Sequence, residues 1–117
     1  MYISPRSPRA LRTDTRQIFF TAHGGRVQGV FFRAHTVQAA TELSLTGWVR
    51  NLPSGMAVQG EVQGPADAVE TFLKAVDKGP PGAHVVRLDR KNVKVTDGEV
   101  GFRKVKSYEE PPVLSEA

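Results

Sequence analysis

The chain contains no cysteine among its 117 residues, and only 8% of its residues are aromatic. Without thiols it can form no disulfide bond and cannot use a cysteine nucleophile, and a zinc site would have to rely on histidine and carboxylate ligands. It also has no apolar run of the ~20 residues that a membrane-spanning helix needs. These absences exclude a cysteine-dependent phosphatase and predict a cytoplasmic protein with no membrane partner.

The three histidines do not form a pattern that could bind a metal in place of cysteine. His23, His35 and His84 are scattered along the chain with no spacing typical of metal ligands. Structural or surface roles are the simpler interpretation of all three. We therefore expect no metal site and no cofactor.

Charge is distributed unevenly along the sequence. The first 16 residues hold four arginines against one aspartate, and the last nine hold three glutamates and no basic residue. We expect residues 1–16 to form a disordered basic extension, residues 17–108 to form one folded domain, and residues 109–117 to form an acidic tail. The extension also resembles an organelle transit peptide, although a disordered tail is the simpler interpretation. The net charge of +4 suits small anionic substrates and would equally suit nucleic acid.

Apolar periodicity predicts five strands and two helices. A helix is expected to begin at Phe32, with Phe32, Thr36 and Ala39 or Ala40 on one face, and a second to begin at Pro65. The strands are expected at residues 17–23, 45–50, 56–63, 84–89 and 101–106. The first four strands and the two helices follow the order β-α-β-β-α-β, which indicates an α+β fold of the ferredoxin-like, split β-α-β type, in which two helices cover one face of an antiparallel sheet.

Two segments stand out as candidates for a binding site. GRVQGVFFR runs from Gly25 to Arg33 between the first strand and the first helix, and GWVRN runs from Gly47 to Asn51. A glycine-containing turn before a helix can direct several backbone N–H groups at one anion, and the helix N-terminus adds partial positive charge. Arg33 could hold two phosphate oxygens through its planar guanidinium. The pattern predicts a phosphate site, but not of the nucleotide P-loop type, because Val30 and Phe31 replace the required lysine and serine or threonine.

With both segments in order, the chain resembles the acylphosphatases, small enzymes that hydrolyse acyl phosphates to a carboxylate and inorganic phosphate. The resemblance extends from about Ile18 to Tyr108. It implies that Arg33 binds the substrate phosphate and that Asn51 orients the attacking water. It also implies that backbone amides complete the phosphate cradle, contributed by Arg26, Val27, Gln28, Gly29, Val30 and Phe31. The resemblance further implies that the chain binds an acyl phosphate substrate and the phosphate product, and that it binds no nucleic acid. We expect a monomer.

The sequence departs from the family pattern at two places inside the domain. His23 stands where the family usually has an aliphatic residue, and the segment from Gly55 to Gly64 is one residue longer, so that Ala57 or Val58 takes the place of a usual valine. These positions affect a strand end and a hairpin, so they bear on geometry and register more than on the chemistry.

Three other interpretations remain open at this point. Asn51 alone could simply form a turn. The same order of elements builds RNA-recognition domains, and Phe19 or Phe20 could face outward for base stacking. The chain could also act as the acylphosphatase-like domain of a larger carbamoyl-transfer protein.

Overall fold

The computed structural model describes residues 14–24, 31–95, 98 and 100–105. These ranges contain five strands and two helices in the order β-α-β-β-α-β-β. Their bounds are β1 (Thr15–His23), α2 (Phe32–Glu42), β2 (Thr46–Asn51), β3 (Ala57–Pro65), α3 (Ala66–Lys78), β4 (Arg87–Val93) and β5 (Phe102–Val105).

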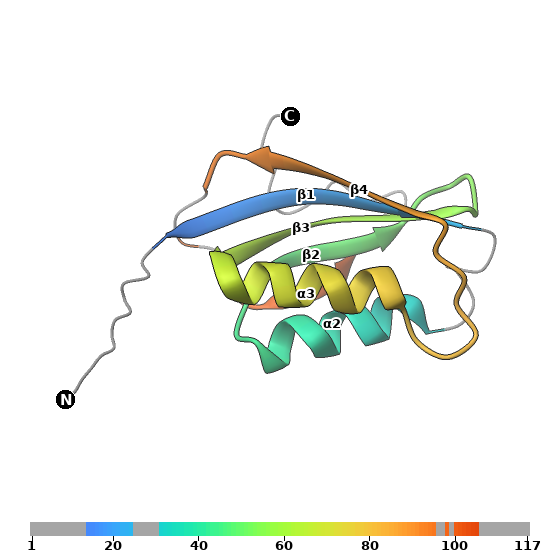
Figure 1. Cartoon of the computed structure of the whole chain (residues 1–117), viewed down its shortest axis with the longest axis horizontal. Helices are drawn as coiled ribbons and strands as arrows, with labels where there is room; N and C mark the ends of the chain where they lie inside the picture. The colour runs from blue at the N-terminus through green and yellow to red at the C-terminus, as the bar shows by residue number, and fades with distance from the viewer. Residues whose placement is uncertain (1–13, 25–30, 96–97, 99, 106–117) are drawn as a thin grey trace.

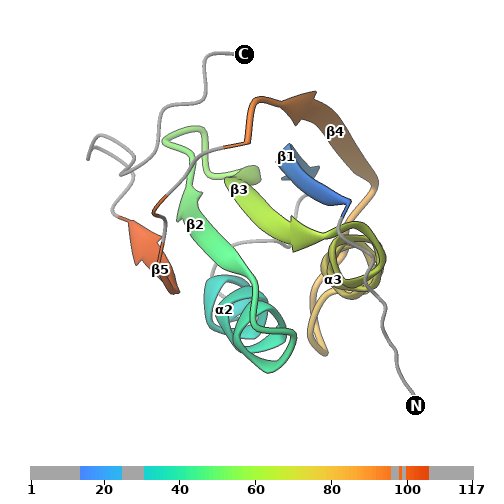
Figure 2. The same cartoon turned by 90° about the vertical axis from the view of Figure 1, so that its left-hand side faces the viewer.

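The strands form one sheet in the order β4-β1-β3-β2-β5, and both helices lie on the same face of it (Figures 1 and 2). Helix α2 packs against β2 and β5, whereas α3 packs against β1 and β3. The arrangement confirms the expected ferredoxin-like fold. It differs in one respect: β5 pairs with β2 in parallel, so the sheet is mixed rather than wholly antiparallel.

The fourth strand was predicted at the wrong residues. We expected it at residues 84–89, but β4 runs from Arg87 to Val93 and pairs with β1 from His23 to Gln17. Its second half reads Arg90-Lys91-Asn92, which has no apolar alternation, because an edge strand needs few buried side chains. The other bounds are within two residues of expectation, except that the end predicted for the last strand, residue 106, lies outside the described residues.

The core lies between the sheet and the helices. On β1, Ile18, Phe20 and Ala22 point toward the helices and are fully buried. The ring of Phe20 meets that of Phe72 from α3 edge-on, with ring centroids 5.5 Å apart. Thr36 is also buried, and its hydroxyl donates to the carbonyl oxygen of Phe32 one turn earlier at 2.9 Å. Phe32, Thr36 and Ala40 are the buried residues of α2, which confirms the face predicted for the first helix.

The opposite face of the sheet also buries large side chains. Trp48 and Glu61 lie directly across from each other on β2 and β3, and both are nearly inaccessible to solvent. The indole Nε1–H donates to the Glu61 carboxylate at 3.0 Å, which satisfies the one polar group of the tryptophan. Of the two phenylalanines considered for this face, Phe19 occupies it and Phe20 belongs to the core.

A surface ion pair connects α3 to β4. The guanidinium of Arg90 donates to both carboxylate oxygens of Glu70, and this hydrogen bonding holds the pKa of Glu70 below its usual value. Both side chains are more than one third exposed, so the pair adds little to stability. It joins the two elements that the α3–β4 connection links.

The glycine that ends α3 generates a test of packing. Gly79 has φ +71°, and a Cβ there would lie 3.0 Å from the Cβ of Ala83 and 3.1 Å from the ring of Phe32. We expect Gly79→Ala to lower the free energy of unfolding by about 2–3 kcal/mol, through backbone strain and crowding together. Urea denaturation measures this difference.

Gly55→Ala is the matched control. Gly55 has φ +83°, and a Cβ there would meet nothing within 4 Å. Gly55→Ala should therefore lower the free energy of unfolding through backbone strain alone, by about 1 kcal/mol. Equal losses for the two variants would contradict the packing of Gly79 against Phe32.

Candidate functional site

The ends of β1 and β2 meet at one end of the sheet. Both strands are antiparallel to β3, which lies between them, so they are parallel to each other. Val58 of β3 pairs with Ala22 on one side and with Asn51 on the other. Asn51 therefore lies two strands, or about 10 Å, from the point where β1 leads into the loop.

Helix α2 begins at the same end of the sheet. Its last turn leads directly through Leu43–Leu45 into β2, so α2 runs back along β2, against which it packs. Eleven helical residues span about 16 Å and six strand residues about 20 Å, so the two elements have similar lengths. The first turn of α2, which carries the half-buried Arg33, is therefore level with the end of β2 near Asn51.

The side chain of Asn51 lies on the face of the sheet that the helices cover. Val49, two residues earlier on β2, is fully buried in the core between sheet and helices. Because side chains alternate along a strand, Asn51 points to the same side. It is the last residue of β2 and is itself half-buried. It ends the strand rather than forming the turn that follows.

The N-terminus of α2 carries no negative charge of its own. Its first turn has no acidic residue, and its N-cap makes no side-chain hydrogen bond. In α3, by contrast, Asp67 lies in the first turn and accepts a hydrogen bond from the Ala68 N–H at 2.8 Å. The partial positive charge at the start of α2 is thus not neutralised by its own side chains, and a bound anion would be stabilised there.

Phe31, the N-cap residue of α2, has an unusual conformation. Its φ of 61° lies in the left-handed region, which is rare for an aromatic residue, and its side chain is 84% exposed. Its carbonyl oxygen accepts the first helical hydrogen bond, from the His35 N–H at 2.9 Å. Strained backbone of this kind is concentrated at functional sites.

The remaining loop residues implied by the resemblance lie outside the described residues. They are Arg26, Val27, Gln28, Gly29 and Val30, and their part in a phosphate cradle stays a prediction. Within the described ranges, no carboxylate forms an ion pair with Arg33. Its guanidinium is therefore not neutralised by any of those residues.

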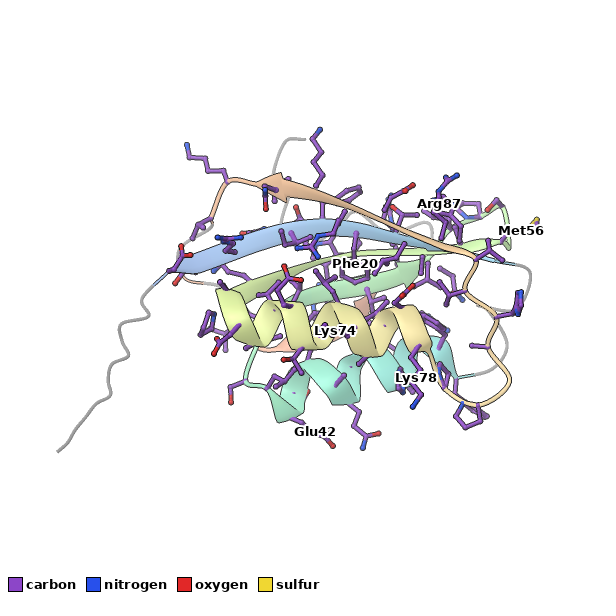
Figure 3. All side chains as sticks on the ribbon, in the orientation of Figure 1. Phe20, Glu42, Met56, Lys74, Lys78 and Arg87 are labelled. Atoms are coloured by element: carbon purple, nitrogen blue, oxygen red, sulfur yellow. The ribbon has the colours of Figure 1, made fainter. Side chains whose placement is uncertain are left out.

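Two connections contact the chain where β1 leads into this loop. The Gly24 N–H donates to the carbonyl oxygen of Met56, in the β2–β3 hairpin, at 3.1 Å. On the other side of β1, the Val86 N–H donates to the carbonyl oxygen of His23 at 2.8 Å, which attaches the α3–β4 connection to the strand end. Figure 3 shows Met56 and Arg87 at the same end of the molecule.

A charged cluster at the end of β1 was not predicted from the sequence. The Nε2 of His23 lies 2.9 Å from a carboxylate oxygen of Asp89, and the Nε of Arg87 lies 3.1 Å from the other. Register and alternation place all three side chains on the face of the sheet opposite the helices. In the sequence, His23 stands out only as a departure from the family pattern. Its partners cannot be identified there, because they are more than 60 residues away in the chain.

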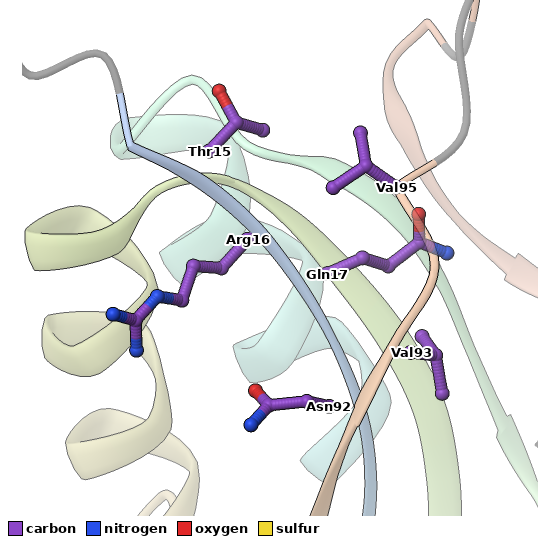
Figure 4. Close-up of a pocket in the computed structure, with 6 residues that line it drawn as sticks. All are labelled: Thr15, Arg16, Gln17, Asn92, Val93 and Val95. Carbon is purple, nitrogen blue, oxygen red and sulfur yellow. The ribbon is translucent and has the colours of Figure 1, made fainter.

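Two hollows on the described surface lie away from Arg33 and Asn51. One, of about 170 Å³, is at the start of β1 (Figure 4) and is lined by Thr15, Arg16, Gln17, Asn92, Val93 and Val95. The other, of about 260 Å³, is on the outer face of β1 and β4. In the part of the chain that the structure describes, no three histidine, aspartate or glutamate side chains gather to hold a metal ion, and no helix is long and apolar enough to cross a membrane.

Comparisons with known proteins point to one family. The family model described as acylphosphatase matches residues 19–104. An acylphosphatase of Methylococcus capsulatus is 49% identical over 72 residues, which cover 62% of this chain and 77% of the relative. One of Salinibacter ruber is 46% identical over 93 residues, which cover 80% of this chain and 97% of the relative. A solved acylphosphatase structure from Coxiella burnetii superimposes with a TM-score of 0.73 at 35% identity, covering 80% of this chain and 96% of that one.

The conformation of Phe31 generates a stability test. Because its side chain is largely exposed, Phe31→Gly should relieve the backbone strain and lose little packing. We expect the free energy of unfolding to rise by about 0.5–1 kcal/mol, measured by urea denaturation.

Ser44→Gly serves as the comparison, since Ser44 is exposed, has φ 57°, and lies at the other end of α2. It should show a similar gain in stability. A loss for Phe31→Gly beside a gain for Ser44→Gly would mean that the phenylalanine ring makes stabilising contacts.

Proposed function

Because this chain belongs to the acylphosphatase family, we propose that it hydrolyses acyl phosphates by direct in-line attack of water on phosphorus. The chain is an acylphosphatase, so its products are a carboxylate and inorganic phosphate. The water oxygen would form a bond to phosphorus as the bond between phosphorus and the acyl oxygen breaks. The acyl oxygen would leave with the electron pair, and the protons of the water would remain with phosphate and solvent.

This reaction places modest demands on the protein. The leaving carboxylate has a pKa near ~4 and departs as an anion, so it needs no general acid. The remaining tasks are to position the reactants and to stabilise the charge on the transferring phosphoryl group. An arginine, fixed amide dipoles and a water-holding amide are sufficient for both tasks.

The proposal assigns Arg33 and Asn51 to these tasks. Arg33 would hold two phosphoryl oxygens, and the backbone amides of residues 26–31 would donate to the same group. Asn51 would position the water, since its amide both donates and accepts hydrogen bonds. The observation that carries the assignment is that β1, β2 and α2 meet at one end of the sheet, with Arg33 in the first turn of the helix and Asn51 at the end of the strand.

We propose that the enzyme is a cytoplasmic monomer that takes a small-molecule acyl phosphate and does not bind nucleic acid. The family match supports the enzyme over an RNA-binding module. Consistent with this, Phe20 and Trp48, two of the aromatic residues on the central strands, are buried and not available for stacking on bases.

Arg33→Ala tests the phosphate-binding residue. Turnover of an aromatic acyl phosphate, followed by ultraviolet absorbance with EDTA present, should fall at least ~100-fold, and inhibition by inorganic phosphate should weaken with it. Arg33→Lys keeps the charge but not the planar pair of donors, so its activity should lie between that of the wild type and that of Arg33→Ala. Near-normal turnover in a folded Arg33→Ala variant would remove Arg33 from the site.

Asn51→Ala tests the water-positioning residue. In the same assay kcat should fall about 100-fold, while the inhibition constant of inorganic phosphate changes less than about twofold. Thermal unfolding of the variant provides the control. If Asn51→Ala instead loses its stability, or loses phosphate affinity and turnover together, the residue has a structural or binding role.

A further inference from the structure

The α3–β4 connection, residues 79–86, lies beside both ends of the loop that joins β1 to α2. At its start, Gly79 packs closely against the ring of Phe32, the first residue of α2. At its end, the Val86 N–H donates to the carbonyl oxygen of His23, the last residue of β1. The connection therefore contacts the last residue of β1 and the first residue of α2, on one side of this end of the sheet (Figure 1).

The two residues assigned to the reaction lie on the other side. Asn51 ends β2, which is separated from the β1–β4 side of the sheet by β3. On α2, the Nε2 of His35 lies 3.2 Å from the carbonyl oxygen of Ala75, so that flank of the helix faces α3. Arg33 precedes His35 by two residues and so points roughly 160° away from it around the helix. Arg33 and Asn51 thus share the flank away from the α3–β4 connection.

The geometry of in-line displacement relates this separation to the position of the acyl group. The attacking water and the leaving oxygen must lie on opposite sides of the phosphorus atom. If Asn51 holds the water, the acyl group leaves on the side away from Asn51. That side is bordered by the α3–β4 connection.

The composition of this connection suits an apolar acyl group. Its sequence is GPPGAHVV, with no lysine, arginine, aspartate or glutamate, and two consecutive prolines restrict its backbone. Val86 at its end is 66% exposed, so most of its apolar side chain is accessible to a ligand. An apolar group bound against Val86 would remove both surfaces from water.

We propose that Val86 and the α3–β4 connection contact the acyl group of the substrate and give the enzyme a preference for apolar acyl phosphates, aromatic or branched. This inference rests on the proposed in-line reaction with Asn51 holding the water. Val86 acts in it as a specificity-determining residue and takes no part in bond making or breaking.

The test compares benzoyl phosphate with acetyl phosphate on the full chain. Val86→Ser should lower kcat/KM for benzoyl phosphate about 3- to 10-fold and change that for acetyl phosphate less than about twofold, because the smaller acyl group has little apolar surface to lose. Val86→Phe should shift the ratio in the opposite direction. Inhibition by inorganic phosphate should stay unchanged in both variants, since phosphate lacks an acyl group.

Met56→Ser is the matched control. Met56 is also apolar and 60% exposed at the same end of the sheet, but it lies in the β2–β3 hairpin and not in the α3–β4 connection. Its substitution should leave the ratio between the two substrates unchanged.

The outcomes separate this inference from the proposed function. A folded wild type that hydrolyses neither substrate would overturn both. An active wild type whose substrate ratio does not respond to Val86 would overturn this inference alone, as would a ratio that responds to Met56 instead, which would put the acyl group on the hairpin side.

Discussion

The antiparallel pairing of β3 with both of its neighbours is the constraint on which the candidate site depends. Because β3 runs opposite to β1 and to β2, those two strands point the same way, and their ends are brought to one end of the sheet. Gly60 makes this pairing possible at the centre of β3. A Cβ there would lie 2.7 Å from the ring of Phe20 and would run into the backbone of Trp48. Gly60 therefore allows both the packing of Phe20 in the core and the pairing of β3 with β2, which sets the distance between the ends of β1 and β2.

The helices and the inner strands could be predicted because their buried side chains are apolar and recur at a regular spacing along the sequence. On α3, the residues Val69, Phe72, Leu73 and Val76 recur at helical spacing, and all four are buried. Strand β4 has no such pattern, since it is an edge strand held by backbone pairing to β1 and by side-chain contacts such as that between Arg90 and Glu70. The parallel pairing of β5 with β2 is a relation between distant segments and leaves no trace in the local sequence.

In the candidate site, too, the residues within short segments could be predicted, whereas the contacts between distant residues could not. Arg33 and Asn51 could be proposed because each belongs to a short segment whose residues are adjacent in the chain. The contact of His23 with Asp89 joins residues 66 positions apart, and neither residue predicts the other. The left-handed backbone of Phe31 was also hidden, because an aromatic residue normally avoids it and only the surrounding structure can impose it.

The strand order also bears on how the protein folds as it is synthesised. Strand β1 is the first of the five in the chain, yet its two neighbours are β3 and β4. One edge of β1 therefore cannot be fully paired until Pro65 has been made, and the other edge until Val93 has been made. Long-range pairing of this kind slows folding and leaves early strands exposed. The apolar side chains of Ile18 and Phe20 stay exposed until α3, the helix that packs against β1, has been made. Because β3 joins β1 to β2, a growing chain could not form the proposed site until β3 has been made.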